Sequence, residues 1–301
     1  MKISLIGTTT FIGPAVIGRL LENGHSISCL IKTDTPQDKI YNLKKIAGVK
    51  KKDDRLSFYT GNLHSTDSIL AHLKDSDAVV CLIDLKNIEF ISNVLTAISR
   101  SPVKRVIFIG STTVLVPFES EVKKAKLASE DMIKNSRLDY TILRPSMIFG
   151  TPEDRNFSKM IAFIKKRGFF IVFGNGNNLI QPVNVDDVAN AVASCLENHA
   201  TFGKTYEISG KAPLQYKDMI QIVKTKLGRQ FKVYYLPVGL SRFAVKLFGK
   251  LSPSSSLKPD MIDRSQIDKA YSYESAAADF GYKPMPFEKG IEKLIKELEK
   301  N

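Results

Sequence analysis

The residues with the clearest chemical meaning lie near the start of the chain, where an apolar run ends in a glycine-flanked turn. The run is Ile3 to Ile6, and the turn contains Gly7, Thr9, Thr10, Phe11, Ile12 and Gly13. A strand that enters a helix through such a turn lets backbone N–H groups and the helix N-terminus face a pyrophosphate. We therefore predict that this loop binds the phosphates of a dinucleotide. The alternative is a tight strand-to-helix turn without a ligand.

The middle position of this loop departs from the usual glycine-rich pattern. In the G-x-x-G-x-x-G form of the loop that position is glycine, whereas here it is Thr10. A side chain places a Cβ and a hydroxyl where the phosphate normally packs closely on the backbone. We expect either a weaker affinity or a shifted loop.

The end of the second expected strand bears on which dinucleotide is bound. No carboxylate stands where a ribose 2′-hydroxyl would be held, and Lys32 is found there instead. A cation at this point favours a 2′-phosphate, so we predict NADP as the cofactor. Asp34 follows shortly afterwards and keeps NAD possible. The alternative for Lys32 is a solvent-facing residue at a strand end.

Short β-branched runs alternate with helical patterns over the first half of the chain and would position these residues. The expected strands are Ile3 to Ile6, Ser26 to Ile31, Leu56 to Thr60, Ala78 to Ile83, Arg105 to Gly110 and Tyr140 to Arg144. The expected helices are Pro14 to Asn23, Thr66 to Leu73, Glu89 to Ser99 and Val122 to Asn135. This alternation is typical of a parallel sheet with helices on both faces. The predicted fold class is α/β, a Rossmann-type doubly wound parallel sheet with a smaller C-terminal substrate lobe.

The domain organisation follows from a change of rhythm after Gly150, where prolines and glycines separate short apolar segments. We predict a dinucleotide-binding domain over residues 1–150 and a smaller mixed α/β substrate lobe over 151–301. The two are interleaved, because residues 183–200 again resemble a strand that enters a helix and return to the first domain. The serine-rich stretch Leu251 to Pro259 is the expected exposed loop.

Composition places the chain among ordinary globular proteins, with 43% hydrophobic and 25% charged residues. Its formal net charge of +13 suits a phosphate-bearing ligand, an acidic membrane surface or nucleic acid. The basic clusters lack interleaved aromatics, which makes nucleic acid an improbable partner. The three cysteines are far apart and predict buried core residues in a reducing compartment. With no signal peptide or transmembrane segment recognisable, we expect a cytoplasmic location.

Four blocks of sequence resemble the extended or atypical short-chain dehydrogenase/reductase superfamily, and within it the sugar-nucleotide epimerase and dehydratase relatives. The blocks are Gly7 to Gly13, Gly61-Asn62-Leu63, Lys104 to Ser111 and Leu143 to Gly150. The continuation through residues 152–157, 174–177 and 181–189 is most similar to the branch that contains the accessory subunit of respiratory complex I and its bacterial relatives. The similarity extends over residues 1–210, with a weaker echo at Asp279 to Pro284.

The resemblance implies a catalytic site that is incomplete. The superfamily uses a Tyr-x-x-x-Lys pair with a neighbouring Ser or Thr, in which the tyrosine is the general acid/base and the lysine lowers its pKa and holds the nicotinamide ribose. Lys126 matches the lysine, and Ser111 or Thr112 matches the hydroxyl, but Val122 stands where the tyrosine belongs. Valine has no titratable proton, so we expect binding to survive and ordinary catalysis to fail. The alternative for Lys126 is one more solvated lysine on a lysine-rich helix.

The resemblance also assigns cofactor contacts outside the loop. The superfamily's acidic residue after the third strand, which meets the adenine, is replaced by Asn62, so adenine recognition is altered rather than removed. The remaining expected cofactor contacts are Leu63, Leu82, Ile83, Ile109, Pro145, Met147 and Ile148, together with Lys126.

Other candidate sites have simpler interpretations. The four histidines do not have metal-ligand spacing, so no metal site is expected. We interpret Asp186-Asp187 as a helix N-cap with favourable charge rather than a catalytic pair. The apolar stretch from Leu240 to Leu251 contains Arg242, Lys246 and Lys250, and is either a lobe helix packed on the core, a cleft wall, or a helix that lies against a membrane or protein partner.

Two functional hypotheses from different classes follow. The first is an NADP-preferring oxidoreductase or epimerase-like enzyme with a rearranged active site, acting on a small or nucleotide-linked substrate. The second is a catalytically silent dinucleotide-binding protein that serves as a structural, assembly or sensing partner. A nucleic-acid-associated protein is a third and weaker alternative.

Overall fold

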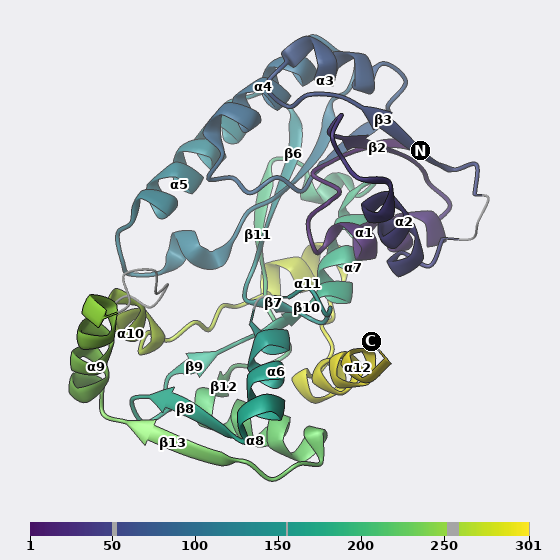
Figure 1. Ribbon diagram of the computed structural model, residues 1–301. Helices are drawn as coiled ribbons and strands as arrows, with labels where there is room; N and C mark the ends of the chain where they lie inside the picture. Colours follow the sequence, from purple (N-terminus) through teal and green to yellow (C-terminus); the bar gives the residue numbers. More distant parts are fainter. Residues whose placement is uncertain (50–52, 155, 252–258, 301) are drawn as a thin grey trace.

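A computed structural model describes residues 1–49, 53–154, 156–251 and 259–300, and its centre is one parallel β-sheet (Figure 1). The seven strands follow the order β3-β2-β1-β4-β5-β6-β11, and every neighbouring pair is parallel. The strands are β1 (Lys2–Ile6), β2 (Ser26–Ile31), β3 (Leu56–Thr60), β4 (Ala78–Cys81), β5 (Arg105–Ile109), β6 (Asp139–Pro145) and β11 (Lys204–Ile208). The order reverses at β1, which places a crevice at the carboxyl ends of β1 and β4. The predicted doubly wound fold is confirmed.

Helices cover both faces of this sheet because its strands are apolar on both sides. Leu5 of β1 joins the core under one set of helices, whereas its neighbour Ile6 joins the core under the other. The first set is α1 (Gly13–Glu22), α2 (Gln37–Ile46), α7 (Val185–Cys195) and α11 (Glu274–Phe280). The second set is α3 (Thr66–Leu73), α4 (Ile88–Ser99) and α5 (Glu121–Lys134).

Three elements of the sheet domain were not expected from the sequence: helix α2, helix α11 and strand β11. Among the side chains of helix α2 that the structure describes, only Leu43 is buried, and most residues of the helix are polar. Strand β11 lies at the edge of the sheet, where only Tyr206 and Ile208 are buried. The expected strand Ala78 to Ile83 ends earlier, at Cys81. All three cysteines are free and fully buried, as predicted.

The rest of the chain builds a smaller lobe around its own apolar core. Three two-stranded pairs belong to it: β7 (Ile148–Phe149) with β10 (Val183–Asn184), β8 (Phe169–Phe173) with β13 (Lys232–Leu236), and β9 (Leu179–Ile180) with β12 (Leu214–Gln215). Its helices are α6 (Phe157–Arg167), α8 (Tyr216–Leu227), α9 (Val238–Leu251), α10 (Pro259–Ser265) and α12 (Phe287–Lys300). The rings of Phe149, Phe157 and Phe287 pack together at centroid distances of 5.1 to 5.3 Å. The predicted loop from Leu251 to Pro259 falls largely on residues 252–258, outside the described residues.

The start of α7 corrects one prediction. The N-cap is Asn184, whose side chain accepts a hydrogen bond from the backbone N–H of Asp186 at 2.9 Å. Asp186 and Asp187 occupy the first turn and do not cap the helix. Asp186 forms an ion pair with Lys293 of α12, and Asp187 accepts a hydrogen bond from the backbone of Met285. The two carboxylates therefore tie the last helix to the sheet domain instead of acting together.

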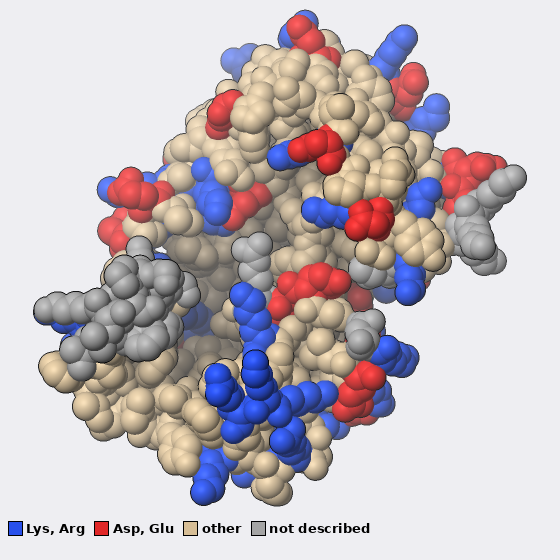
Figure 2. Space-filling model, viewed as in Figure 1, with Lys and Arg blue, Asp and Glu red and all other residues tan. Residues whose placement is uncertain are grey.

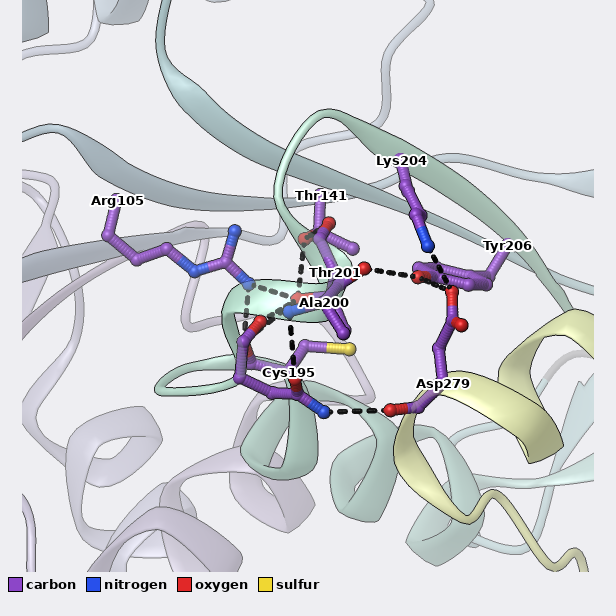
Figure 3. A network of polar contacts seen from close by, with 9 residues as sticks. Arg105, Thr141, Cys195, Ala200, Thr201, Lys204, Tyr206 and Asp279 are labelled. Atoms are coloured by element: carbon purple, nitrogen blue, oxygen red, sulfur yellow. Dashed lines mark hydrogen bonds and ion pairs between the residues drawn. The ribbon is translucent and has the colours of Figure 1, made fainter.

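A buried arginine fastens the returning chain to the sheet (Figure 3). Arg105 at the start of β5 donates hydrogen bonds to the main-chain oxygens of Leu196 and Asp139, at 3.0 and 2.7 Å. It also donates to the carbonyl of Cys195 and, at 2.9 Å, to the hydroxyl of Thr201. Its acceptors come from the end of α7, the start of β6 and the turn before β11. A single side chain therefore orders three segments that are distant in sequence.

Candidate functional site

A cavity of about 1090 Å³ lies at the carboxyl ends of the central strands, between the sheet domain and the smaller lobe. The surface is hollowed in this region (Figure 2). The expected site residues that line it are Thr9, Thr10, Phe11, Ile12, Leu82, Ile109, Ser111, Thr112, Lys126, Pro145, Met147 and Ile148. Those that lie outside the lining are Gly7, Gly13, Lys32, Asn62, Leu63 and Ile83. The fold thus brings together residues from five separate segments of the sequence.

The loop after β1 consists of two consecutive tight turns that only glycine permits. Thr10 N–H donates to the carbonyl of Gly7 at 3.2 Å, and Gly13 N–H donates to the carbonyl of Thr10 at 3.0 Å. Gly7 has φ +84°, and a Cβ on it would lie 2.9 Å from the backbone of Leu82 and Ile83. A Cβ on Gly13 would lie 1.9 Å from the carbonyl oxygen of Thr8. Both glycines shape the loop although neither lines the cavity.

The loop has polar groups that fit a phosphate. The hydroxyl of Thr10 is buried and has no hydrogen-bond partner among the residues that the structure describes. The N-terminus of α1 has no side-chain cap, so its first N–H groups are not satisfied in that way. A phosphate oxygen is a suitable acceptor for both. These residues therefore fit the pyrophosphate of a dinucleotide, with the Thr10 side chain as an added donor.

One cation that lines the cavity, Lys39, was not singled out from the sequence. Lys32 is exposed at the end of β2, away from the cavity lining. Lys39 and Asn42, both on α2, line the cavity instead. Because this helix was not expected, the sequence offered no reason to choose them.

Asn62 serves the loop in which it stands. Its side-chain oxygen accepts a hydrogen bond from the backbone N–H of His64 at 2.9 Å, and its own N–H donates to the hydroxyl of Ser68. The side chain is exposed. It closes the turn between β3 and α3.

Lys126 is the buried cation of the site. Only 7% of its surface is exposed, which excludes a solvated surface lysine. Its Nζ lies 2.7 Å from Oδ1 of Asp84, just after β4. Burial of Asp84 opposes its ionisation, but the hydrogen bond and charge of Lys126, aided by Lys86, hold the pKa of that carboxyl below its ordinary value. Asp84 lines the cavity beside Lys126, and no sequence motif had indicated it.

The helix that carries Lys126 is firmly placed. Glu130, one turn further along α5, is fully buried and accepts a hydrogen bond from Nε of Arg144 at 3.0 Å. Ser129 donates to the carbonyl of Leu85 at 2.6 Å. Val122, one turn before Lys126, is 44% exposed and does not line the cavity. The position that matches the superfamily's tyrosine therefore has neither a proton nor access to the site.

A phenol reaches the cavity from the other lobe. Tyr271 is held at its backbone, because its N–H donates to Oε1 of Gln181 at 2.8 Å and its carbonyl accepts from Ser209 at 2.7 Å. Burial raises the pKa of the Tyr271 phenol, and a hydrogen bond with the side chain of Thr112 offsets part of the rise. Arg264 and Lys269 line the same wall, and burial together with the charge of Arg264 lowers the pKa of Lys269. Nothing in the sequence singled out Tyr271, Arg264 or Lys269, because they belong to no recognisable motif and lie before the segment from Asp279 to Pro284.

No group of three or more His, Cys, Asp or Glu side chains suited to a metal occurs within the described part of the chain.

The strand order, the glycine-shaped loop at the end of β1 and the cavity beneath a second lobe define the class of Rossmann-type dinucleotide-binding proteins with an added substrate lobe. The cavity wall opposite the loop comes from that second lobe.

Comparison with known proteins agrees with this class. A family model described as NAD(P)H-binding matches residues 7–199. The chain belongs to this NAD(P)H-binding family. The family is defined by NAD(P)H binding, and membership does not distinguish NAD from NADP.

Individual relatives differ in their roles. The chain is 26% identical over 257 residues to mitochondrial NADH dehydrogenase [ubiquinone] 1 alpha subcomplex subunit 9 of Arabidopsis thaliana, covering 79% of this chain but 61% of that protein. It is 24% identical to UDP-glucose 4-epimerase of Vibrio cholerae, covering 94% of this chain and 90% of that one. Among solved structures, DesIV, a dTDP-glucose 4,6-dehydratase of Streptomyces venezuelae with NAD and TYD bound, superimposes with a TM-score of 0.77. That likeness covers 100% of this chain and 98% of the other at 16% identity, and concerns the fold.

Proposed function

We propose that this protein binds NADP(H) in the cavity without the tyrosine-dependent chemistry of its superfamily, and acts as a structural, assembly or sensing protein. The observation that carries the proposal is the exposed Val122, outside the cavity, at the tyrosine position. Without a phenol one turn before Lys126, that helix has no group to move a proton to or from a substrate oxygen. Of the two hypotheses raised by the sequence, this geometry favours the second.

Four side chains that line the cavity, Thr10, Lys39, Asp84 and Lys126, have a part in the proposed binding. The loop N–H groups and the Thr10 hydroxyl hold the pyrophosphate, and Lys39 faces the 2′-phosphate. A bound nicotinamide dinucleotide would supply a hydride donor or acceptor. Lys126 would donate hydrogen bonds to ribose hydroxyls and Asp84 would accept from them, because both side chains line the cavity and form an ion pair at 2.7 Å.

The names of relatives are compatible with either role. The Arabidopsis protein is named as a subunit of NADH dehydrogenase, whereas the Vibrio protein is named as an epimerase. The Lys126–Asp84 pair supports the non-enzymatic role, because a lysine engaged by a carboxylate is less able to lower the pKa of a neighbouring phenol.

A second function is supported by Tyr271. Its phenol shares a hydrogen bond with Thr112 in the cavity, next to the hydroxyl position of the superfamily. An oxidoreductase or epimerase acting on a nucleotide-linked substrate would use this phenol in place of the missing one. Its raised pKa keeps it protonated at neutral pH, so it would donate a hydrogen bond or a proton to a substrate carbonyl and would be a poor base.

The deciding experiment starts with cofactor binding. NADPH and NADH are titrated into the protein, and nicotinamide fluorescence and the rise of the melting temperature are followed. We expect saturable binding with NADPH tighter than NADH. If neither binds, the proposal is refuted and the Thr10 loop is a plain turn.

The second step tests catalysis. The wild type and Val122→Tyr are compared for oxidation of NADPH with a panel of nucleotide-sugar and small carbonyl substrates. We expect no turnover by either protein, because position 122 lies outside the cavity and a tyrosine there does not reach a bound substrate. Turnover by the wild type that Tyr271→Phe abolishes, but Tyr273→Phe leaves unchanged, would establish the enzymatic alternative. Tyr273 is a matched control because its phenol bonds to the carbonyl of Lys211 and does not line the cavity.

A further inference from the structure

The positive charge of the protein is concentrated on the smaller lobe. Residues 157–173 and 214–246 contain eleven Lys and Arg and a single acidic residue, Asp218, which is most of the formal net charge of +13. These segments form α6, β8, α8, β13 and the first part of α9. Figure 2 shows Lys and Arg side chains gathered over the lower part of the molecule, where α6 and α8 lie in Figure 1.

Few of these cations are neutralised by acidic side chains. Salt bridges engage Lys165 with Glu299, Lys226 with Glu292 and Arg242 with Asp263. The other eight have no carboxylate partner among the residues that the structure describes. An unbalanced field of this size attracts a polyanionic surface.

Large apolar side chains are exposed within the same segments. Leu240 and Phe243 on α9 are 55% and 65% exposed, and Tyr234 and Tyr235 on β13 are 48% and 46% exposed. Phe163 on α6 is 40% exposed, and it and Tyr234 both pack edge-on against Phe169. A soluble surface rarely groups exposed aromatic and aliphatic residues in this way without a partner.

Helix α9 exposes Leu240 and Phe243 because of the way it is anchored to the lobe. Its other face is turned inward, where Ser241 and Val245 are buried and the Ser241 hydroxyl bonds to the carbonyl of Pro237. Arg242 ties the helix to α10 through Asp263. Leu240 and Phe243 are three positions apart and so lie on one side of the helix. Their exposure therefore follows from how the helix is anchored.

We propose that the surface made by Leu240 and Phe243 of α9, on a lobe rich in lysines and arginines, docks on an anionic lipid bilayer. Apolar side chains enter the headgroup region while the cations meet lipid phosphates and carboxylates, which is the combination that holds peripheral proteins on membranes. No helix in the described ranges is long and apolar enough to cross a bilayer, so the contact is superficial. Nucleic acid fits less well, because the exposed Leu240 within the docking surface offers nothing to a phosphate or a base.

The sequence allows a clean optical test because it contains no tryptophan. Phe243→Trp reports on the docking surface, and Tyr41→Trp on α2, where the native side chain is 63% exposed, is the matched control. Each variant is mixed with vesicles of phosphatidylcholine alone and with added phosphatidylserine. We expect a blue shift of the emission for Phe243→Trp with the anionic vesicles only, reversed by salt, and no shift for Tyr41→Trp.

Affinity provides the second readout. The affinity for anionic vesicles, measured by sedimentation, should fall about tenfold or more in the double variant Leu240→Ser/Phe243→Ser. It should remain unchanged in Tyr41→Ser. The wild type and these two variants should bind NADPH equally, which separates the membrane proposal from the proposal of cofactor binding. Absence of vesicle binding, equal shifts in both tryptophan variants, or tighter binding of a duplex DNA than of anionic vesicles would each overturn it.

Discussion

Replacing the buried Arg105 by methionine should destabilise the protein through the acceptors it leaves behind. The carbonyls of Leu196 and Asp139 would lose the Arg105 donor, and the carbonyl of Cys195 would keep only the hydrogen bond from the Thr201 hydroxyl at 3.2 Å. At about 1–3 kcal/mol each, the three losses together cost about 6 kcal/mol. Holding the charge is itself unfavourable, because burial lowers the pKa of Arg105 to about 10. Methionine avoids that penalty of about 3 kcal/mol, so the net loss is about 3 kcal/mol.

This free-energy loss converts into a measurable melting shift. At about 2.1 cal/mol/K per residue, a chain of 301 residues has an unfolding entropy near 0.6 kcal/mol/K, so Arg105→Met should melt about 5 °C lower. Arg100→Met is the matched control, because Arg100 pairs with Asp67 on the surface at 51% side-chain exposure and should shift the melt by about 1 °C or less. Circular dichroism melts of both variants provide the comparison. Equal shifts would refute the assignment of Arg105 as the tie between sheet and returning chain.

Three further predictions concern pH and the cofactor. Burial lowers the pKa of His72 to about 4, so its stabilising neutral form is complete above about pH 6.5 and is lost as pH falls toward 4. The urea midpoint should therefore decline less between pH 7 and 4.5 in His72→Gln than in the wild type, with exposed His199→Gln matching the wild type. Thr10→Gly should weaken NADPH binding about tenfold, because the hydroxyl that donates to the phosphate is lost. An unchanged Kd in calorimetry would show that the hydroxyl does not contact the phosphate. Lys39→Ala should lower affinity for NADPH about tenfold and leave NADH unaffected, whereas Lys32→Ala should affect neither; the reverse pattern in the same titration would restore Lys32 as the phosphate ligand.

The sheet domain could be predicted because its signals are local. Strands such as Ser26–Ile31 are short apolar runs, and helices such as Thr66–Leu73 have apolar residues at helical spacing next to a serine N-cap. The loop from Gly7 to Gly13 is also local, since its two turns are closed by hydrogen bonds between residues three apart. Where the local signal is weak, as in α2, most of whose residues are polar, the prediction missed the element and the Lys39 that it carries.

The sequence by itself determined the class of fold and the position of the glycine-shaped loop after β1, because both depend on patterns of residue type along the chain. Only the tertiary structure decided that Lys126 is paired with Asp84, that Tyr271 reaches Thr112, and that Arg105 joins the end of α7 to the sheet. These contacts join residues that are between 42 and 159 positions apart in the sequence. Parallel crossovers bring strand ends to one edge of the sheet, but which side chains meet there depends on how helices and lobes pack against each other.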